Sequence, residues 1–153
     1  AAAVAHHARG QLKGVLGQVL VYPGLGGDMT TGSYAEHAQA PMLTRDDCLY
    51  YQQIRCDGPP PTDDPSFAPL QDSDFSNLPP TVLVTADCDP LRDDARHYCD
   101  HLQAAGGQVH WINEPGLVHG YLRARHSVGR AKHSFERISV AIEALGQNIW
   151  PFD

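Results

Sequence analysis

The sequence has no long apolar run and little positive charge. A bilayer span needs about 20 consecutive apolar residues, and no stretch of this 153-residue chain approaches that length. The alanine-rich opening has no basic flank, so it does not resemble a signal peptide. Eleven basic residues against eighteen acidic ones give a net charge of −7, which disfavours binding to a phosphate backbone. We therefore expect a cytoplasmic protein with no membrane span and no nucleic-acid partner.

Metal-binding and disulfide patterns are also missing. The four cysteines include no C-x-x-C pair and are too few for a disulfide scaffold in a chain of this length. Free thiols are the simplest interpretation, and a Cys48–Cys56 or a Cys88–Cys99 bridge stays open as an alternative. His97 and His101 lie one helical turn apart but have no third ligand beside them, so we expect them to face solvent. We expect no metal and no other cofactor.

The chain does contain an alternation of strand and helix patterns. Short β-branched runs over 17–22, 81–86 and 108–113 show little polar alternation, which is typical of strands that are covered on both faces of a parallel sheet. The third run is expected to end at Pro115-Gly116. Helical patterns lie between and after these runs, so the sequence predicts a single α/β domain with a mostly parallel sheet and helices on both faces.

The predicted helices are indicated by different sequence signals. Residues 91–105 have apolar side chains every three or four positions, and a glycine pair follows them. Residues 1–9 resemble the tail of a helix, and Thr44 with Asp47 forms a capping-box pattern at the start of another. The segment 58–80 is rich in Pro, Asp and Ser and is expected to be an ordered surface excursion. The apolar sides are expected to be Leu49, Tyr50 and Ile54 in the helix from Thr44, and Ala131, Phe135, Ile138, Ile142 and Leu145 in the last helix.

Two residues with catalytic chemistry follow neighbouring predicted strands. Asp89 comes after the second strand and His119 after the third, and a single helix connects the two strands. Ligands of open α/β sheets bind at the carboxyl ends of the strands, so both side chains are expected at one edge. A carboxylate there can accept the Nδ1–H of the histidine while Nε2 takes a proton from a nucleophile.

Simpler structural roles exist for the same residues. Asp89 followed by proline is also typical of a helix N-terminus, with the aspartate as the cap. His119 before a glycine is also typical of a turn. Asp87, Asp93 and Asp94 are expected to form a solvated acidic face that interacts with the helix dipole. Only the expected pairing of an acid and a histidine at one edge of the sheet favours a catalytic role over these structural roles.

A nucleophile for this pair is not found in the chain. The nucleophile of an α/β hydrolase lies in G-x-S-x-G, and none of the serines has that context. Ser33 has a glycine directly before it and none after it. The histidine–glycine run that shapes an oxyanion hole is absent as well. The chain therefore supplies two residues of a three-residue catalytic arrangement. We expect the chain to be inactive on its own.

Two motifs carry a family resemblance. The first is Asp87-Cys88-Asp89-Pro90-Leu91-Arg92-Asp93 and the second is Leu117-Val118-His119-Gly120-Tyr121. Together with residues 18–23, 65–70 and 78–86, they make the sequence similar to the C-terminal half of the hormone-sensitive-lipase-like α/β hydrolases, which include bacterial carboxylesterases and acetyl esterases. By this resemblance Asp89 matches the catalytic acid and His119 the catalytic base, whereas Asp87 and Asp93 match flanking positions.

The resemblance implies that residues 1–153 are the C-terminal portion of one α/β-hydrolase domain. Residues 1–9 resemble the helix after the nucleophile turn, so the serine would lie about ten residues before Ala1. The function implied is part of a serine carboxylesterase that hydrolyses short-chain acyl esters and contributes the acid and histidine of a Ser-His-Asp triad. The expected partners are an ester substrate and the N-terminal segment of the same enzyme, which would carry the nucleophile, the oxyanion hole and the cap.

Two alternatives remain from the sequence. One is a non-catalytic small-molecule binding protein or receptor on the same fold, and the other is an unrelated chain that pairs with another copy of itself. The resemblance also implies that further strands flank residues 18–22. Without them an edge and one face of the sheet are expected to be bare, so we expect the chain not to fold stably alone.

Overall fold

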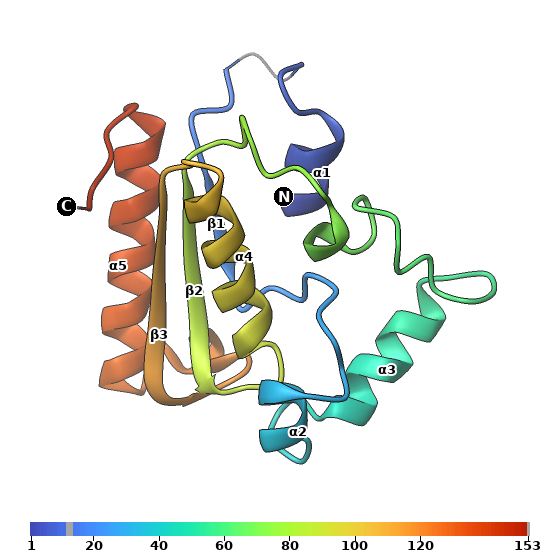
Figure 1. The fold of residues 1–153 in the computed structure, drawn as a ribbon. Coiled ribbons are helices and arrows are strands. Elements are labelled where there is room, and N and C mark those ends of the chain that lie inside the picture. The colour runs from blue at the N-terminus through green and yellow to red at the C-terminus, as the bar shows by residue number, and fades with distance from the viewer. Residues whose placement is uncertain (12–13, 153) are drawn as a thin grey trace.

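Three parallel strands form the centre of the computed structural model, which describes residues 1–11 and 14–152. The strands are β1 (Gln18–Val21), β2 (Thr81–Cys88) and β3 (Val109–Val118), in the order β1-β2-β3. In the register of the sheet, Leu83 of β2 lies between Leu20 and Trp111. All three strands run toward the lower edge of the sheet in Figure 1, where β2 and β3 end, whereas β1 ends opposite Val84 in the middle of β2. The predicted parallel α/β arrangement is confirmed.

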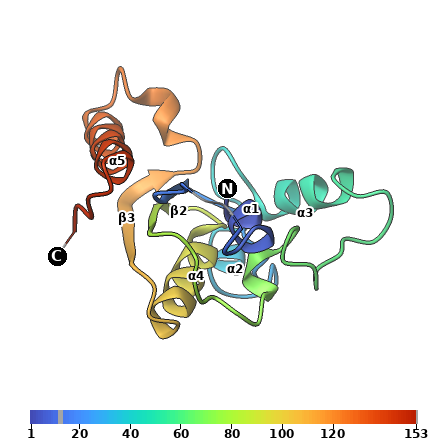
Figure 2. The same cartoon turned by 90° about the horizontal axis from the view of Figure 1, so that it is seen from above.

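Helices cover both faces of the sheet. Figures 1 and 2 show α1 (Ala2–His7) and α4 (Arg92–Ala104) on one side and α5 (Gly129–Gly146) on the other. Leu83 packs in a core with Tyr98 of α4, whereas Val82 and Val84 pack against α5. Because β2 is buried on both faces, it reads as a continuous apolar run. The expected bare sheet face is therefore wrong. The expected bare edge is seen at β1, which among the described strands pairs with β2 alone.

The long connection from β1 to β2 carries two helices and a short turn. These are α2 (Gly32–Glu36), α3 (Arg45–Ile54) and the 3₁₀ turn η1 (Pro69–Gln71). The predicted capping box is present, because the Thr44 hydroxyl accepts the backbone N–H of Asp47 at 3.1 Å. The predicted surface excursion over 58–80 is anchored by Phe75, which is buried in the core beside α4.

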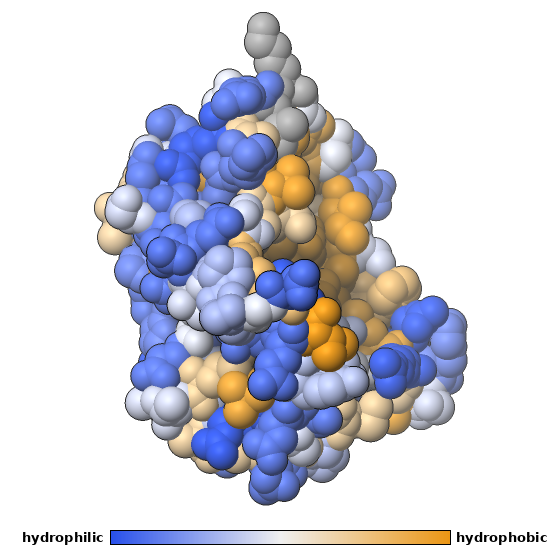
Figure 3. All heavy atoms as spheres, turned by 90° about the vertical axis from the view of Figure 1, so that its right-hand side faces the viewer, coloured by the Kyte–Doolittle hydropathy of each residue, from blue (hydrophilic) through white to orange (hydrophobic). Residues whose placement is uncertain are grey.

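The predicted apolar side of α3 is not buried. Leu49 and Ile54 are 42% and 59% exposed, and the buried residue of α3 is Cys48. Figure 1 shows α3 standing away from the sheet, and the face in Figure 3 has hydrophobic surface in a recess between hydrophilic margins. The helix therefore packs through one end and leaves its apolar side chains accessible.

The last helix also differs from its predicted stripe. Ala131, Ile138 and Leu145 are buried as expected, but Phe135 and Ile142 are 42% and 56% exposed. The buried stripe continues instead through Ser134 and Ala141. The hydroxyl of Ser134 is hydrogen-bonded to the phenol of Tyr121 at 2.6 Å, so a polar residue can occupy an interior position. No helix in residues 1–11 and 14–152 is long and apolar enough to cross a membrane.

Candidate active site

Asp89 and His119 meet where β2 and β3 end. The Asp89 Oδ2 lies 2.8 Å from the His119 Nδ1, so the predicted contact is present. Because a carboxylate only accepts, Nδ1 carries the proton and Nε2 keeps its lone pair. Asp89 is fully buried, whereas the imidazole is 24% exposed, and among the described residues Nε2 has no recorded partner. The arrangement leaves a basic nitrogen open to the surface.

The turn before α4 fixes the carboxylate. The second oxygen of Asp89, Oδ1, accepts the backbone N–H of Leu91 at 2.9 Å, and the Asp89 carbonyl accepts the N–H of Arg92 at 3.1 Å. Helix α4 itself begins at Arg92 with Leu91 at its cap position, so the expected cap at Asp89 is wrong by two residues. Asp89 nevertheless combines a structural contact with the predicted one, because one oxygen closes the turn before α4 and the other contacts the imidazole.

The neighbouring acids are not a solvated face. Asp93 and Asp94 are buried in the first turn of α4 and accept backbone N–H groups of the connection after β1. Asp93 binds the N–H of Ser33 at 2.9 Å, and Asp94 binds the N–H of Leu25 at 2.7 Å. Burial raises the pKa of Asp94. The predicted exposure is wrong for both, because the loop itself supplies the donors that make burial acceptable.

Asp87 shapes the end of β3 that carries His119. Its carboxylate accepts the Asn113 side-chain amide at 3.0 Å and the Gly116 N–H at 3.2 Å, and both bonds lower the pKa of Asp87. The sheet register shifts here, so β3 continues through Pro115-Gly116 to Val118 instead of ending before them. As an edge strand, β3 tolerates the proline. Gly120, with φ +72°, then turns the chain directly after His119 into the short turn η2 (Tyr121–Ala124).

Tyr22 is a site residue to which the sequence assigned no role. Its ring centroid lies 4.6 Å from that of His119, and its backbone has φ +35°, in the left-handed region that non-glycine residues rarely occupy. Burial raises the pKa of Tyr22, the Arg123 charge acts to lower it, and the Asp89 charge acts to raise it further. Its position directly after β1, at the same edge as Asp89 and His119, was the available signal.

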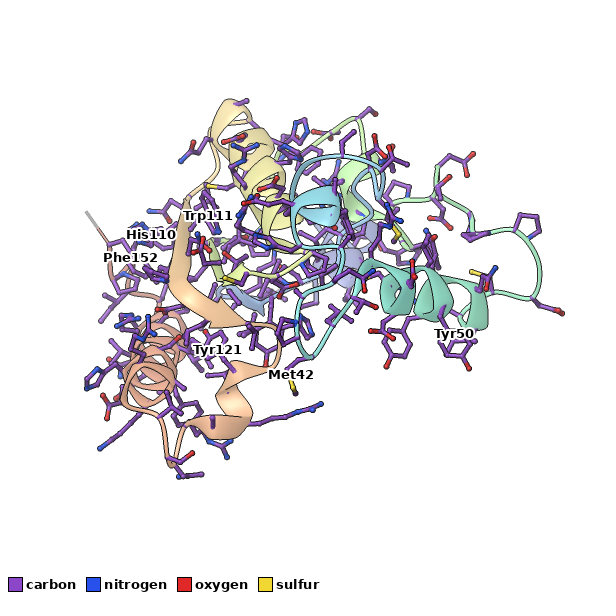
Figure 4. The ribbon with its side chains drawn as sticks, turned by 90° about the horizontal axis from the view of Figure 1, so that it is seen from below. Met42, Tyr50, His110, Trp111, Tyr121 and Phe152 are labelled. Carbon is purple, nitrogen blue, oxygen red and sulfur yellow. The ribbon has the colours of Figure 1, made fainter. Side chains whose placement is uncertain are left out.

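A cavity of about 200 Å³ opens in front of His119. Its walls come from the loop after β1, from α3 and from the start of α4, and the residues that set its character are Met29, Leu43, Gln52, Arg55, Phe67 and Leu91. Figure 4 looks onto this edge of the sheet, with Met42 and Tyr121 near its centre and Tyr50 pointing away from α3. Sequence analysis missed the cavity because its walls are brought together only by tertiary contacts.

Two residues near the cavity, Ser33 and Cys48, have nucleophilic side chains, but neither is placed to act as the nucleophile. Ser33 is fully buried, and its hydroxyl donates to the Pro90 carbonyl at 2.6 Å. Cys48 lines the cavity, but burial raises the pKa of its thiol to about 12, which keeps it protonated and weakly nucleophilic. All four cysteines are free, and neither of the two alternative bridges forms. His97 and His101 are exposed, as predicted.

An acid–histidine pair at the carboxyl edge of a parallel sheet, in the chain order acid then histidine, is the arrangement of the α/β hydrolases. A family model described as alpha/beta hydrolase fold matches residues 1–123. The chain belongs to this family, in its hormone-sensitive-lipase-like group, and it corresponds to the C-terminal portion of the related esterases.

Three relatives illustrate the similarity. Carboxylesterase NlhH of Mycobacterium tuberculosis is 39% identical over 108 residues, which is 69% of this chain and 34% of that protein. The ethyl acetate hydrolase of Pseudomonas putida is 30% identical over 132 residues, 86% of this chain and 41% of that protein. A Pyrobaculum calidifontis esterase structure superposes with a TM-score of 0.87 at 28% identity, over 95% of this chain and 48% of that one. The chain spans less than half the length of each.

Proposed function

We propose that the chain supplies the acid and base of a serine carboxylesterase for short-chain acyl esters. The observation that carries the proposal is the 2.8 Å contact between Asp89 and His119, with the imidazole at the mouth of a mainly apolar cavity. The similarity to carboxylic ester hydrolases supports the reaction class. The nucleophilic serine comes from a segment that precedes Ala1, and "intact protein" below means this chain together with that segment.

The mechanism follows from the two ring nitrogens of His119. Nε2 removes the proton of the serine hydroxyl as its oxygen attacks the ester carbonyl, and it then gives that proton to the leaving alcohol. The carboxylate of Asp89 accepts the Nδ1–H throughout and stabilises the imidazolium. Water then repeats both proton transfers and releases the acid from the acyl-enzyme. The burial of Asp89 and its bond to the Leu91 N–H hold the imidazole in this orientation.

Residues 1–153 are, in this proposal, the C-terminal portion of one domain. The unpaired edge of β1 and the exposed apolar side of α3 are surfaces that a preceding segment covers. We expect the isolated chain to lack esterase activity and to unfold without a cooperative transition, which calorimetry measures. A cooperative, monomeric thermal transition of residues 1–153 would contradict this part of the proposal.

Labelling with a fluorophosphonate tests the function. The intact protein is expected to react at one serine in a G-x-S-x-G context upstream of Ala1, as identified by peptide mass spectrometry. His119→Gln is expected to slow the labelling strongly, whereas His97→Gln, which changes an exposed histidine of α4, serves as the matched control and leaves it unchanged. An intact protein that binds esters but is never labelled would instead be a binding protein on the same fold.

A further inference from the structure

The cavity in front of His119 contains one permanent charge. Apart from the titratable His119, Arg55 is the only charged side chain that lines it within the described part of the chain. Arg55 follows the last residue of α3, and the other walls are largely apolar. Arg55 is an exposed side chain, so its charge lies at the rim of the cavity, where an anionic group of a ligand can contact it.

The guanidinium of Arg55 is oriented but not paired. It lies over the ring of Phe67, with its central carbon 4.4 Å from the ring centroid. A cation–π contact of this kind uses the face of the ring and does not require any of the N–H donors to form a hydrogen bond, so they remain available to another partner. Within residues 1–11 and 14–152, no hydrogen bond or ion pair to a protein group is recorded for these donors.

Two carboxylates near Arg55 in the sequence bind other groups, and Asp57, two residues after Arg55, forms no ion pair with it in the described structure. Asp47 binds Thr44 in the capping box, and Asp64 binds Ser66 in a turn. Some arginines pair with carboxylates, as Arg92 does with Glu36 at 2.7 Å, whereas others within the described residues, such as Arg45 and Arg123, do not, and what distinguishes Arg55 is its place at the cavity. Arg55 therefore stands out as a cation held in place by an aromatic ring, beside a ligand cavity and without an internal counter-ion.

We propose that Arg55 binds a carboxylate on the ester substrate and makes the enzyme selective for esters that carry one. This inference rests on the proposed esterase function and names its substrate class. A planar carboxylate can accept two parallel N–H bonds from the guanidinium, which adds geometric selectivity to the charge attraction. The carboxylate belongs either to the acyl part, as in a half-ester of a short dicarboxylic acid, or to the alcohol part, as in an ester of a short hydroxy acid.

Matched ester pairs test the inference with the intact protein. Monoethyl glutarate is compared with ethyl pentanoate, and the acetyl ester of γ-hydroxybutyrate with butyl acetate, by titrating the released acid at constant pH. We expect Arg55→Gln to lower kcat/KM about ten- to hundredfold for the charged member of one pair. The kcat/KM for the neutral ester of the same pair is expected to change little. Arg55→Lys keeps the charge but not the paired bonds, so it is expected to recover part of the loss.

A second stacked arginine provides the control. Arg125 lies over Phe135 at 5.2 Å on another part of the surface, and Arg125→Gln is expected to leave both pairs unchanged. The inference is overturned if Arg55→Gln lowers charged and neutral esters equally, which is a structural effect, or if it lowers neither. If the unchanged protein hydrolyses no ester, the proposed function fails. Calorimetric binding of glutarate, with its loss in Arg55→Gln, then decides separately whether Arg55 recognises carboxylates.

Discussion

Two aspartate–histidine contacts occur among the described residues, and they differ in what the second ring nitrogen of the histidine binds. At the carboxyl ends of the strands, His119 Nδ1 is 2.8 Å from Asp89, and Nε2 has no recorded partner among the described residues. Beside α1, His6 Nδ1 is 2.6 Å from Asp72, but its Nε2 lies 2.8 Å from the phenol of Tyr98. An acid next to a histidine therefore does not define a base. The second ring nitrogen decides, because only a free nitrogen can take a proton from a substrate or nucleophile.

The two contacts also differ in how deeply their histidine side chains are buried. His6 is buried between α1 and α4 and packs edge-on against Phe75, 5.1 Å between ring centroids. Its bonds connect α1 with the segment before β2 and with α4, so the role of the pair is to hold a helix in place. The imidazole of His119 is partly exposed at a cavity. The comparison predicts that changes at His119 affect turnover, whereas changes at His6 affect stability.

The largest effect is expected for His119→Gln. Removal of the general base should lower kcat of the intact protein on a short-chain ester by about 10⁴-fold or more. Little change in thermal stability is expected, because the imidazole is partly exposed. His6→Gln is the matched variant and should leave kcat nearly unchanged. Equal losses of kcat in both variants would remove the distinction between the two pairs.

Asp89→Asn is expected to have the next largest effect. The amide preserves an oxygen that can accept the Leu91 N–H, so folding should persist. It no longer accepts the Nδ1–H of His119 as a carboxylate does, and kcat should fall by about 10³- to 10⁴-fold. Steady-state kinetics and a melting curve measure the two effects. A lower melting temperature with normal kcat would mean that Asp89 acts only through the turn before α4.

Sequence analysis predicts the buried positions of an element well where those positions are apolar. It fails where a buried position or a strand end depends on a hydrogen bond to another part of the chain. The predicted stripe of α4 is confirmed at Ala95, Tyr98 and Leu102, which are apolar and buried, whereas Ala105 is exposed. The α5 stripe was misjudged because Ser134 is acceptable in the interior only through its bond to Tyr121. The end of β3 was misjudged because a local proline–glycine signal was outweighed by the bond from Gly116 to Asp87, a residue of a different strand.

The candidate site also has a part that the sequence predicts and a part that it does not. Asp89 and His119 were predictable as neighbours because parallel strands joined by one helix bring their following loops together. The cavity was not predictable, because α3 and the loop after β1 reach it through contacts such as that from Leu25 to Asp94. Burial of Asp94 depends on backbone donors, and backbone groups leave no trace in the side-chain pattern. A motif search therefore finds the acid and the histidine and misses the cavity beside them.

A smaller effect is expected on stability for His6→Leu. This change removes the bonds to Asp72 and Tyr98 and leaves a buried phenol with one partner fewer, at a cost of about 1–3 kcal/mol. Denaturant unfolding of the intact protein measures the loss. His97→Leu on the exposed side of α4 is the control and should cost less. If His6→Leu instead lowered kcat with unchanged stability, the pair beside α1 would have a role in catalysis that its buried geometry does not suggest.

The smallest expected effect is on how the stability of the folded protein depends on pH, through Asp72. Burial acts to raise the pKa of Asp72, but hydrogen bonds from His6, from the Asp74 N–H and from Arg9 outweigh it and lower the pKa to about 2. A carboxyl whose pKa is lowered by folding stabilises the folded state above its ordinary pKa, and this stability is lost as the pH falls from about 4 towards 2. Asp72→Asn should therefore cost about 1–2 kcal/mol at neutral pH, allowing for solvent screening.

The same variant should also show a shallower loss of stability between pH 4 and pH 2, because the group that titrates there is gone. Urea unfolding of the intact protein at a series of pH values measures this slope. Asp100→Asn changes an exposed carboxyl of α4 and should leave the slope as it is. Parallel stability curves for Asp72→Asn and the unchanged protein would show that Asp72 has no lowered pKa. The contact of His6 with Asp72 would then hold α1 by shape rather than by charge.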